Sequence, residues 1–284
     1  MHYDNFDLVI IYRAYPGISK VPIVKNMSKL ESVLTNILSI KRSTGSLNVK
    51  YLIILDRCEL EYKKYISEIL NDCNLVFYEV DFGSGEKTFE LQLKLTDMFE
   101  DEQNVLMLED DYIMNNHCLS NLVAFLKEQP DNFCTPFYST DYDLLDFHKY
   151  QREIISVQDC KWRKVSCTTL TFCAKVKTIR KYRSVFLSFL RGNNDSSIWM
   201  AITKILNVRI TLKGDLKVYF LKKYFKLAWF IGFNYFFTKV AALYADVGSS
   251  ATHLESTNCA INTEKLISEN EKVKIVDNKL YVSK

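Results

Sequence analysis

The eight cysteines of this 284-residue chain include no Cys-x-x-Cys pair, so the usual spacing of a zinc cluster is missing. The start of the chain also lacks a signal sequence, because its first seven residues contain two acids and no basic cluster, and the apolar run that follows ends at Tyr12. Without an export signal, scattered cysteines argue against a disulfide framework and for reduced thiols. We therefore expect a cytoplasmic protein.

A long uncharged apolar run is missing as well. The stretch from Leu216 to Leu243 is apolar and aromatic, but five lysines interrupt it, whereas a membrane-spanning helix needs about 20 apolar residues. The net charge of +3 is too small to indicate a nucleic-acid or lipid partner unless charge is clustered. Lys217–Lys226 does mix lysines with aromatics, which leaves open a peripheral contact with a membrane or nucleic acid, beside the simpler interpretation as core helices with solvated lysines.

Short apolar runs alternate with helical patterns over the first part of the chain. The runs 8–12, 51–55, 75–80 and 104–108 have the length and composition of buried strands. A capping box, Ser28-Lys29-Leu30-Glu31, predicts the start of a helix that continues to Gly45, and further helices are expected at about 61–70, 87–100 and 119–127. This alternation predicts an α/β fold, a Rossmann-like and mostly parallel sheet with helices on both faces.

The second part of the chain is less regular. After Pro130 the alternation gives way to less periodic sequence, yet no linker or change of composition separates it from the first part. We therefore predict one domain over residues 1–284, with a ligand-binding half at 1–114 and a second half at 115–284 that carries another part of the site and the last helices.

Polar residues follow each predicted strand of the first half. Tyr12 and Arg13 end the first strand, Asp56 and Asp81 follow the next two, and the triplet Glu109-Asp110-Asp111 follows the fourth. In an open parallel sheet, ligands bind outside the carboxyl ends of the strands. The sequence therefore predicts that these residues lie along one rim.

Three consecutive carboxylates after a buried strand repel one another unless a cation or solvent neutralises them. Hard divalent ions take oxygen ligands of this kind, and Mg²⁺ or Mn²⁺ is commonly held by one or two carboxylates together with substrate phosphates. The triplet therefore favours a metal site, although a solvated surface turn could have the same three residues.

The run Leu106-Met107-Leu108 followed by the triplet resembles the strand and DxD-type motif of GT-A glycosyltransferases. Its Glu-Asp-Asp form is similar to that of N-acetylglucosaminyltransferase I, with a family-2-like character. The resemblance implies a GT-A fold and a nucleotide-sugar donor, UDP-sugar by family precedent. It also implies that Asp111 binds Mn²⁺ or Mg²⁺ while Glu109 and Asp110 face the nucleoside or sugar, so 1–114 becomes the donor half and 115–284 the acceptor half.

The same resemblance suggests roles in the second half. Inverting GT-A enzymes place an acid near a helix start with an aromatic shortly after it, a pattern that Asp195 and Trp199 match. Asp195 is therefore the candidate base, and Trp199 is a candidate packing residue for the acceptor wall. The competing interpretation is that Asp195 or Ser196 only caps the helix. His253, in a loop of small residues, matches the late histidine that many of these enzymes use as a metal ligand, unless it is merely an exposed loop residue.

The remaining candidates surround the donor. By the same resemblance, Tyr12 would stack on the base, Arg13 would bond to it, and Asp56 would accept a hydrogen bond from uracil or ribose. Arg13 could equally form a surface ion pair. Lys87 follows Gly83-Ser84-Gly85 at a helix start, where backbone N–H groups favour anions, and could approach a phosphate or ribose.

Taken together, these features predict an inverting, metal-dependent glycosyltransferase, a hexosyl- or N-acetylhexosaminyltransferase, whose acceptor is a glycan, a lipid-linked glycan or a modified nucleic acid. The Gln-x-x-Arg-Trp motif of processive synthases is absent, which favours transfer of one sugar at a time. Two rivals stay open: a sugar-1-phosphate nucleotidyltransferase, disfavoured because the loop after the first strand has a single glycine, and a non-catalytic GT-A-like binding module.

Overall fold

The structure is a computed structural model that describes residues 6–17, 24, 27–144, 153–204, 240–254, 260 and 262–283. The greater part of the Leu216–Leu243 stretch, including Lys217–Lys226, lies outside these residues. Among the helices that are described, none combines the length and the apolar character that crossing a membrane requires. Seven of the eight cysteines lie in the described part, and all seven are free thiols.

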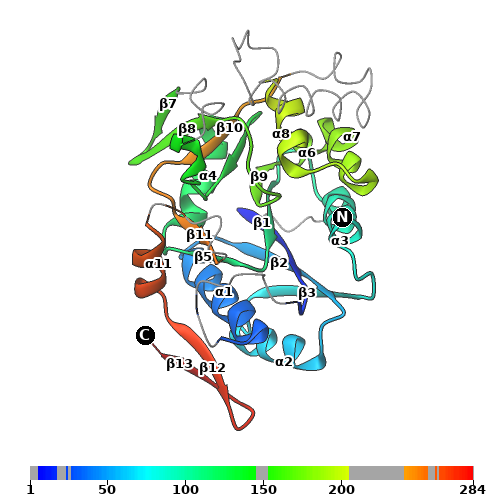
Figure 1. Ribbon diagram of the computed structural model, residues 1–284, viewed down its shortest axis with the longest axis vertical. Helices are drawn as coiled ribbons and strands as arrows, with labels where there is room; N and C mark the ends of the chain where they lie inside the picture. Colours follow the sequence, from blue (N-terminus) through cyan, green and yellow to red (C-terminus); the bar gives the residue numbers. More distant parts are fainter. Residues whose placement is uncertain are drawn as a thin grey trace.

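Four parallel strands form the first half of the sheet, in the order β3-β2-β1-β4 (Figure 1). Each matches a predicted run and extends it by one or two residues at an end. Their bounds are β1 Leu8–Ala14, β2 Val49–Asp56, β3 Asn74–Val80 and β4 Asn104–Glu109. Because all four strands run the same way, their carboxyl ends meet at one edge of the sheet.

Helices connect these strands, as the alternation predicted. They are α1 Lys29–Thr44, α2 Leu60–Ile69, α3 Gly85–Leu95 and α4 Cys118–Glu128. The capping box at the start of α1 is confirmed, since the Ser28 side chain accepts from the Glu31 backbone and the Glu31 side chain accepts from Ser28. The predicted helix 87–100 begins earlier, because Ser84 caps α3, and it ends earlier, because residues Thr96–Met98 form a separate 3₁₀ turn.

The second half extends the same sheet to nine strands, in the order β3-β2-β1-β4-β9-β6-β10-β8-β7. β9 runs antiparallel to β4 and β6, while β10 runs parallel to β6. The added strands are β6 Phe133–Thr135, β7 Ile154–Val157, β8 Cys160–Val165, β9 Phe172–Lys175 and β10 Leu243–Asp246. The predicted α/β fold, a mostly parallel sheet flanked by helices, is confirmed, with the antiparallel strands in the second half. Most of these strands have three or four residues, too short for periodicity to reveal them.

Smaller elements complete the second half. The helices are α5 Asp141–Leu144, α6 Val176–Lys181, α7 Arg183–Phe186, the 3₁₀ helix η3 Leu187–Arg191, α8 Asp195–Thr203 and α11 Thr263–Glu269. The strand β5 Tyr112–Met114 pairs with β11 Ala251–His253, and β12 Lys272–Val276 pairs with β13 Lys279–Ser283. The β5–β11 pair brings residue 253 back to the acidic triplet.

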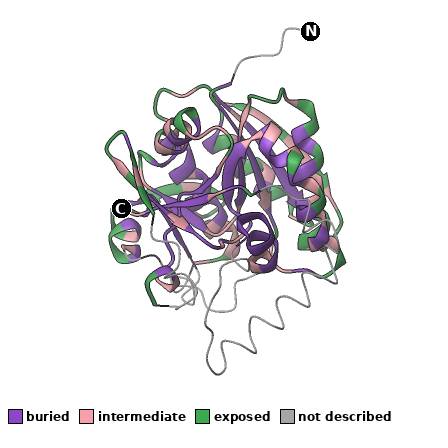
Figure 2. Cartoon of the chain, turned by 90° about the horizontal axis from the view of Figure 1, so that it is seen from above, coloured by how far each residue is buried: buried purple, intermediate pink, exposed green. Residues whose placement is uncertain are grey.

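The central strands β1, β2 and β4 are buried on both faces and are purple in Figure 2, whereas the edge strands β3 and β7 are partly exposed. Along β1, Val9 and Ile11 join the cluster under α3 and α8, whereas Leu8, Ile10 and Tyr12 join the cluster under α1, α2 and α4. This alternation follows from the period of two in a strand. Two apolar layers therefore hold β1 and β4 in place beneath the polar residues at their ends.

Candidate functional site

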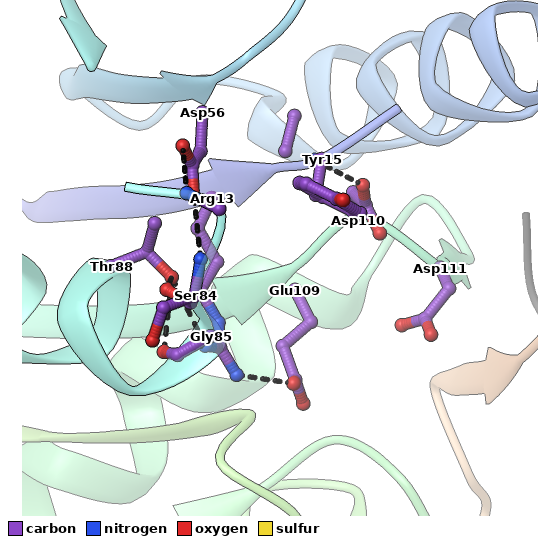
Figure 3. Close-up of a pocket in the computed structure, with 11 residues that line it drawn as sticks. Arg13, Tyr15, Asp56, Ser84, Gly85, Thr88, Glu109, Asp110 and Asp111 are labelled. Carbon is purple, nitrogen blue, oxygen red and sulfur yellow. Dashed lines mark hydrogen bonds and ion pairs between the residues drawn. The ribbon is translucent and has the colours of Figure 1, made fainter. Parts of the chain in front are cut away.

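The carboxyl ends of β1, β2 and β4 surround a pocket of about 320 Å³ (Figure 3). Four segments of the chain line it: the end of β1, the end of β2, the start of α3 and the acidic triplet. The lining residues are Arg13, Ala14, Tyr15, Asp56, Gly83, Ser84, Gly85, Thr88, Glu109, Asp110 and Asp111. The structure therefore brings Arg13, Asp56 and the triplet together, as expected for the rim of a parallel sheet.

The first carboxylate of the triplet is paired with an arginine. Nη2 of Arg13 donates to Oε1 of Glu109 at 2.5 Å, and Nη1 donates to the Gly85 carbonyl at 2.7 Å. The side chains are 12% and 27% exposed, so this is a half-buried ion pair inside the pocket. Arg13 thereby ties β1 and β4 to the first turn of α3, as Figure 3 shows.

The second carboxylate is paired with a lysine. Nζ of Lys29, the first residue of α1, lies 2.7 Å from Oδ1 of Asp110, and the two side chains are 11% and 13% exposed. Oδ2 of Asp110 accepts the backbone N–H of Tyr15 at 2.9 Å. Asp110 therefore holds both flanks of the connection between β1 and α1.

The third carboxylate faces a histidine. Nε2 of His253 lies 3.1 Å from Oδ2 of Asp111, while Oδ1 of Asp111 is buried without a hydrogen-bond partner in the described residues. The His253 ring lies edge-on to Tyr112 and is 6% exposed, so His253 is a buried strand residue and not an exposed loop residue. Among the described residues, no lysine or arginine lies within ion-pair distance of Asp111.

The surroundings shift the pKa values of the three carboxyls in different directions. Burial raises the pKa of Glu109 despite the charge of Arg13, and burial raises the pKa of Asp110 despite Lys29. Burial also acts to raise the pKa of Asp111, but the hydrogen bond and charge of His253, together with Lys29 and Arg13, outweigh it and lower the pKa. Asp111 is therefore the member of the triplet that ionises most readily.

A divalent ion fits the donor set at Asp111. Its buried Oδ1 has no partner, and the nitrogen of His253 lies close enough for both residues to contact one ion. Within the described residues, no group of three or more His, Cys, Asp or Glu side chains converges on a point. Protein would therefore supply about two ligands, as is common for Mg²⁺ bound together with phosphates.

Asp56 organises the far side of the pocket. Oδ1 accepts the backbone N–H groups of Phe82 at 2.7 Å and Gly83 at 2.9 Å, and Oδ2 accepts that of Ser84 at 3.2 Å. Asp56 is 1% exposed, so these bonds satisfy a buried charge. It shapes the turn before α3, and its contact with a donor stays a prediction. Asp81, also expected at this rim, is highly exposed and pairs with Arg57.

Tyr12 is in a different place from the one predicted. Its side chain is 0% exposed, on the α1 side of the sheet, and its hydroxyl has no hydrogen-bond partner in the described residues. Because neighbouring residues of a strand point to opposite faces, Tyr12 lies under the sheet edge while Arg13 enters the pocket. A fully buried ring cannot stack on a base, so this prediction was wrong. Tyr15 is the aromatic residue that lines the pocket, 47% exposed.

Lys87 lies in the first turn of α3 and is exposed. Its backbone N–H donates to the Ser84 hydroxyl that caps the helix, and the pocket lining at this helix comes from Ser84, Gly85 and Thr88. A contact between Lys87 and phosphate stays a prediction.

Asp195 is the first residue of α8, and Asn194 caps this helix. The Asn194 side chain accepts the backbone N–H of Ser197 at 2.9 Å, so the alternative in which Asp195 or Ser196 provides the cap was wrong. Oδ1 of Asp195 accepts the backbone N–H of Ser196 at 2.8 Å, and its carboxylate is partly exposed. The catalytic role of Asp195 stays a prediction.

Trp199 is a core residue, and its role as a packing residue for the acceptor wall stays a prediction. The indole is 0% exposed, packs edge-on against Phe133 and Phe172, and donates from Nε1 to the Thr169 carbonyl at 2.9 Å. It therefore has no surface for an acceptor. Its position still bears on the pocket, because the Thr169 hydroxyl bonds with the Tyr112 hydroxyl and Thr171 contacts Glu109.

Replacing Trp199 by Ala is expected to lower the free energy of unfolding by about 3–5 kcal/mol, because a large buried aromatic leaves a cavity. Urea unfolding followed by circular dichroism measures this change. Replacing Val240, 61% exposed, by Ala is the control and should have little effect. An unchanged unfolding midpoint for Trp199→Ala would contradict the core position.

Sequence reasoning missed Lys29, Tyr15 and Thr88. Lys29 stands at the first position of a helix, where a surface lysine is unremarkable, and nothing in the sequence marks it as the partner of Asp110. Tyr15 and Thr88 could have been found from their neighbours. Tyr15 is two residues after Arg13, so in an extended segment both side chains point to the same side. Thr88 is next to Lys87 on a helix, so the two side chains point in different directions.

No protein-family model matches the chain, and no curated protein matches it. Among solved structures, it is similar to residues 1–349 of S. aureus TarS in complex with UDP, with 14% identity over 68% of this chain and 54% of that chain and a TM-score of 0.47. It is also similar to an active-site mutant of LgtC, with 10% identity over 92% of this chain and 94% of that chain and a TM-score of 0.47. A further match is the galactosyltransferase LgtC with donor and acceptor sugar analogs, with 11% identity over 68% of this chain and 69% of that chain and a TM-score of 0.41.

The chain spans about half the length of the TarS fragment it matches. At these identities and TM-scores, the likenesses do not assign the chain to a family. The functional interpretation therefore depends on the pocket.

Proposed function

We propose that this chain is a glycosyltransferase that moves a hexosyl or N-acetylhexosaminyl group from a nucleotide-sugar, with UDP-sugar favoured, to an acceptor hydroxyl. The observation that carries the proposal is the unequal pairing of the triplet. Arg13 neutralises Glu109 and Lys29 neutralises Asp110, whereas the described residues give the Asp111 side chain His253 alone as a partner and leave its buried Oδ1 without one. A site with one such carboxylate, at the carboxyl edge of a parallel sheet, suits a cation bound with a diphosphate.

Asp111 and His253 are the side chains that would hold a divalent ion, and an imidazole ligand favours Mn²⁺ over Mg²⁺. Such an ion, when bound, supplies positive charge to the diphosphate of the donor. Arg13, while paired with Glu109, keeps its guanidinium group in the same pocket, and Tyr15 offers an exposed ring there. The turn held by Asp56 brings Gly83 and Gly85 to the pocket lining, where the guanidinium group of Arg57 lies against Gly83 and that of Arg13 lies beside Gly85.

In the proposed reaction, the acceptor oxygen attacks the anomeric carbon of the sugar from the face opposite the nucleotide. The bond between that carbon and the diphosphate oxygen breaks, and the nucleoside diphosphate leaves with the bonding electrons. Asp195 takes the proton of the acceptor hydroxyl as general base. One displacement of this kind inverts the anomeric configuration, and the acceptor is a glycan, a lipid-linked glycan or a modified nucleic acid.

Thermal unfolding of the purified chain with UDP, GDP, CDP or dTDP, each with Mn²⁺ or with EDTA, tests the donor class. One nucleotide, UDP by expectation, should raise the unfolding temperature by several degrees only when Mn²⁺ is present, because a ligand at about 100 times its Kd stabilises the folded state by about 2.7 kcal/mol. Mn²⁺ without nucleotide is the control. If no nucleotide changes the unfolding temperature, the proposal fails.

A further inference from the structure

The chain carries a hairpin that the pocket does not use. β12 and β13 pair in antiparallel register, with Val276 opposite Lys279 and Lys274 opposite Tyr281. The two residues between the strands, Asp277 and Asn278, have positive φ angles of 50° and 57°. That conformation is the type I′ turn, which suits the twist of a hairpin and which Asp and Asn tolerate. The hairpin is therefore specified by its own sequence.

Two hydrogen bonds fix this hairpin on α1. The backbone N–H of Val273 donates to the Thr35 hydroxyl at 3.0 Å, and that of Ile275 donates to Oε1 of Glu31 at 3.2 Å. β12 thus runs antiparallel to α1, and the turn at 277–278 lies toward the helix end that starts with Lys29. Lys29 is the partner of Asp110, so the turn lies at the pocket end of the sheet. Figure 1 shows the hairpin extending away from the rest of the molecule.

The two faces of the hairpin differ. On the face that packs toward α1, Val273 is buried and Ile275 and Leu280 are half-buried, while Val282, opposite Val273, is 47% exposed. By the period of two, the outward face carries Lys272, Lys274, Val276, Lys279, Tyr281 and Ser283. Val276 and Tyr281 on it are 50% and 52% exposed. This outward face therefore combines three lysines, of which Lys272 is half-buried, with an aromatic ring and an aliphatic side chain, and the turn beside it adds one exposed carboxylate, Asp277.

We infer that the outward face of the hairpin binds an anionic lipid surface. Lysines near such a surface are attracted to its negative potential, and a tyrosine can place its ring among the headgroups while its hydroxyl stays in water. The exposed valine would gain nothing from a nucleic-acid backbone, but it would be buried by lipid. Because the hairpin projects, it can reach a flat lipid surface without a steric clash between that surface and the rest of the protein. Binding would place the pocket end of the sheet close to the bilayer.

Vesicle sedimentation tests this inference with the full chain. Wild type should bind vesicles of phosphatidylglycerol mixed with phosphatidylcholine and not vesicles of phosphatidylcholine alone, with weaker binding at higher salt. The triple change Lys272→Glu, Lys274→Glu and Lys279→Glu should weaken the binding roughly tenfold or more.

The matched control carries the same change of charge at three exposed lysines elsewhere, Lys127→Glu, Lys161→Glu and Lys181→Glu, and should bind as wild type does. Lys217–Lys226 also mixes lysines with aromatics and could itself bind vesicles. The comparison of the two triple variants therefore shows whether the hairpin is the part of the chain that binds. Equal losses in both, or no loss in the hairpin variant, would overturn the inference.

A second readout follows the hairpin itself. A tryptophan introduced by Tyr281→Trp should be quenched by brominated lipid in anionic vesicles, since the side chain enters the headgroup region. The same measurement with Met98→Trp is the control, because Met98 is 50% exposed and lies before the start of β4, at the edge of the sheet opposite the pocket. Tight binding to a nucleic-acid duplex without any binding to vesicles would also overturn the inference.

Discussion

The variant Asp111→Asn should lose Mn²⁺-dependent nucleotide binding, with a Kd at least about 100-fold weaker, since even a residue behind a metal ligand commonly contributes 10- to 100-fold. Asn keeps the shape of the side chain but removes the charge that Arg13 and Lys29 do not neutralise directly. Isothermal titration with UDP in Mn²⁺ measures the change. Among the three carboxylates, this one should show the largest effect on the metal dependence.

Loss of stability does not explain such a result. Asp111 raises the pKa of both Glu109 and Asp110, so removing its charge relieves repulsion within the triplet. A carboxyl whose pKa is raised by folding costs stability as the pH rises through that pKa, and the Asn variant reduces this cost. His253 lowers the pKa of Asp111, so the ionised Asp111 also stabilises the fold, and the Asn variant gives up that contribution. The two effects oppose each other, and the unfolding temperature without ligand should stay near that of wild type.

Asp81→Asn is the matched control, because Asp81 directly follows β3 at the same edge of the sheet but is 84% exposed and lies outside the pocket lining. It should bind nucleotide as wild type does. If Asp111→Asn retains Mn²⁺-dependent binding, the metal role of Asp111 is wrong. If Asp81→Asn weakens nucleotide binding equally, the loss of one negative charge from the protein explains the weaker binding, and the position of that charge in the triplet does not.

The parts of the site that the sequence predicted correctly depend on the strand ends. Four strands joined by helices must run parallel, so Arg13, Asp56 and the triplet had to lie at one edge. The error at Tyr12 came from treating adjacent strand residues as one unit. Alternation alone puts Tyr12 and Arg13 on opposite faces, and both faces of a parallel sheet are covered by helices. The burial of Tyr12 could therefore have been predicted from the sequence.

Other features depend on tertiary contacts that no local pattern reveals. Trp199 is buried because Phe133, Phe172 and Phe186, from three distant segments, surround it. The pairing of Lys29 with Asp110 joins residues that lie far apart in the sequence, and β5 pairs with β11 to bring His253 to Asp111. A resemblance suggested His253, whereas nothing suggested Lys29.

The variant Asp195→Asn should bind the nucleotide as wild type does and lose transfer, with a turnover roughly 10²- to 10⁴-fold lower, because a general base acts on the chemical step. Release of UDP from the UDP-sugar, measured in the presence of the acceptor, gives the turnover, and the titration used for Asp111→Asn gives the donor affinity. This pattern is the opposite of the one expected for Asp111, so the two roles are separable.

Asn194→Ala is the control that shows whether Asp195 acts as a general base or only supports the start of α8. Asn194 is the cap of α8, and its loss should cost about 0.5–2 kcal/mol of stability while the carboxylate of Asp195 remains. Turnover below the unfolding temperature should therefore stay near that of wild type. If Asp195→Asn and Asn194→Ala reduce turnover equally, Asp195 acts through the start of the helix. If Asp195→Asn transfers sugar at the wild-type rate, the proton of the acceptor goes to another group.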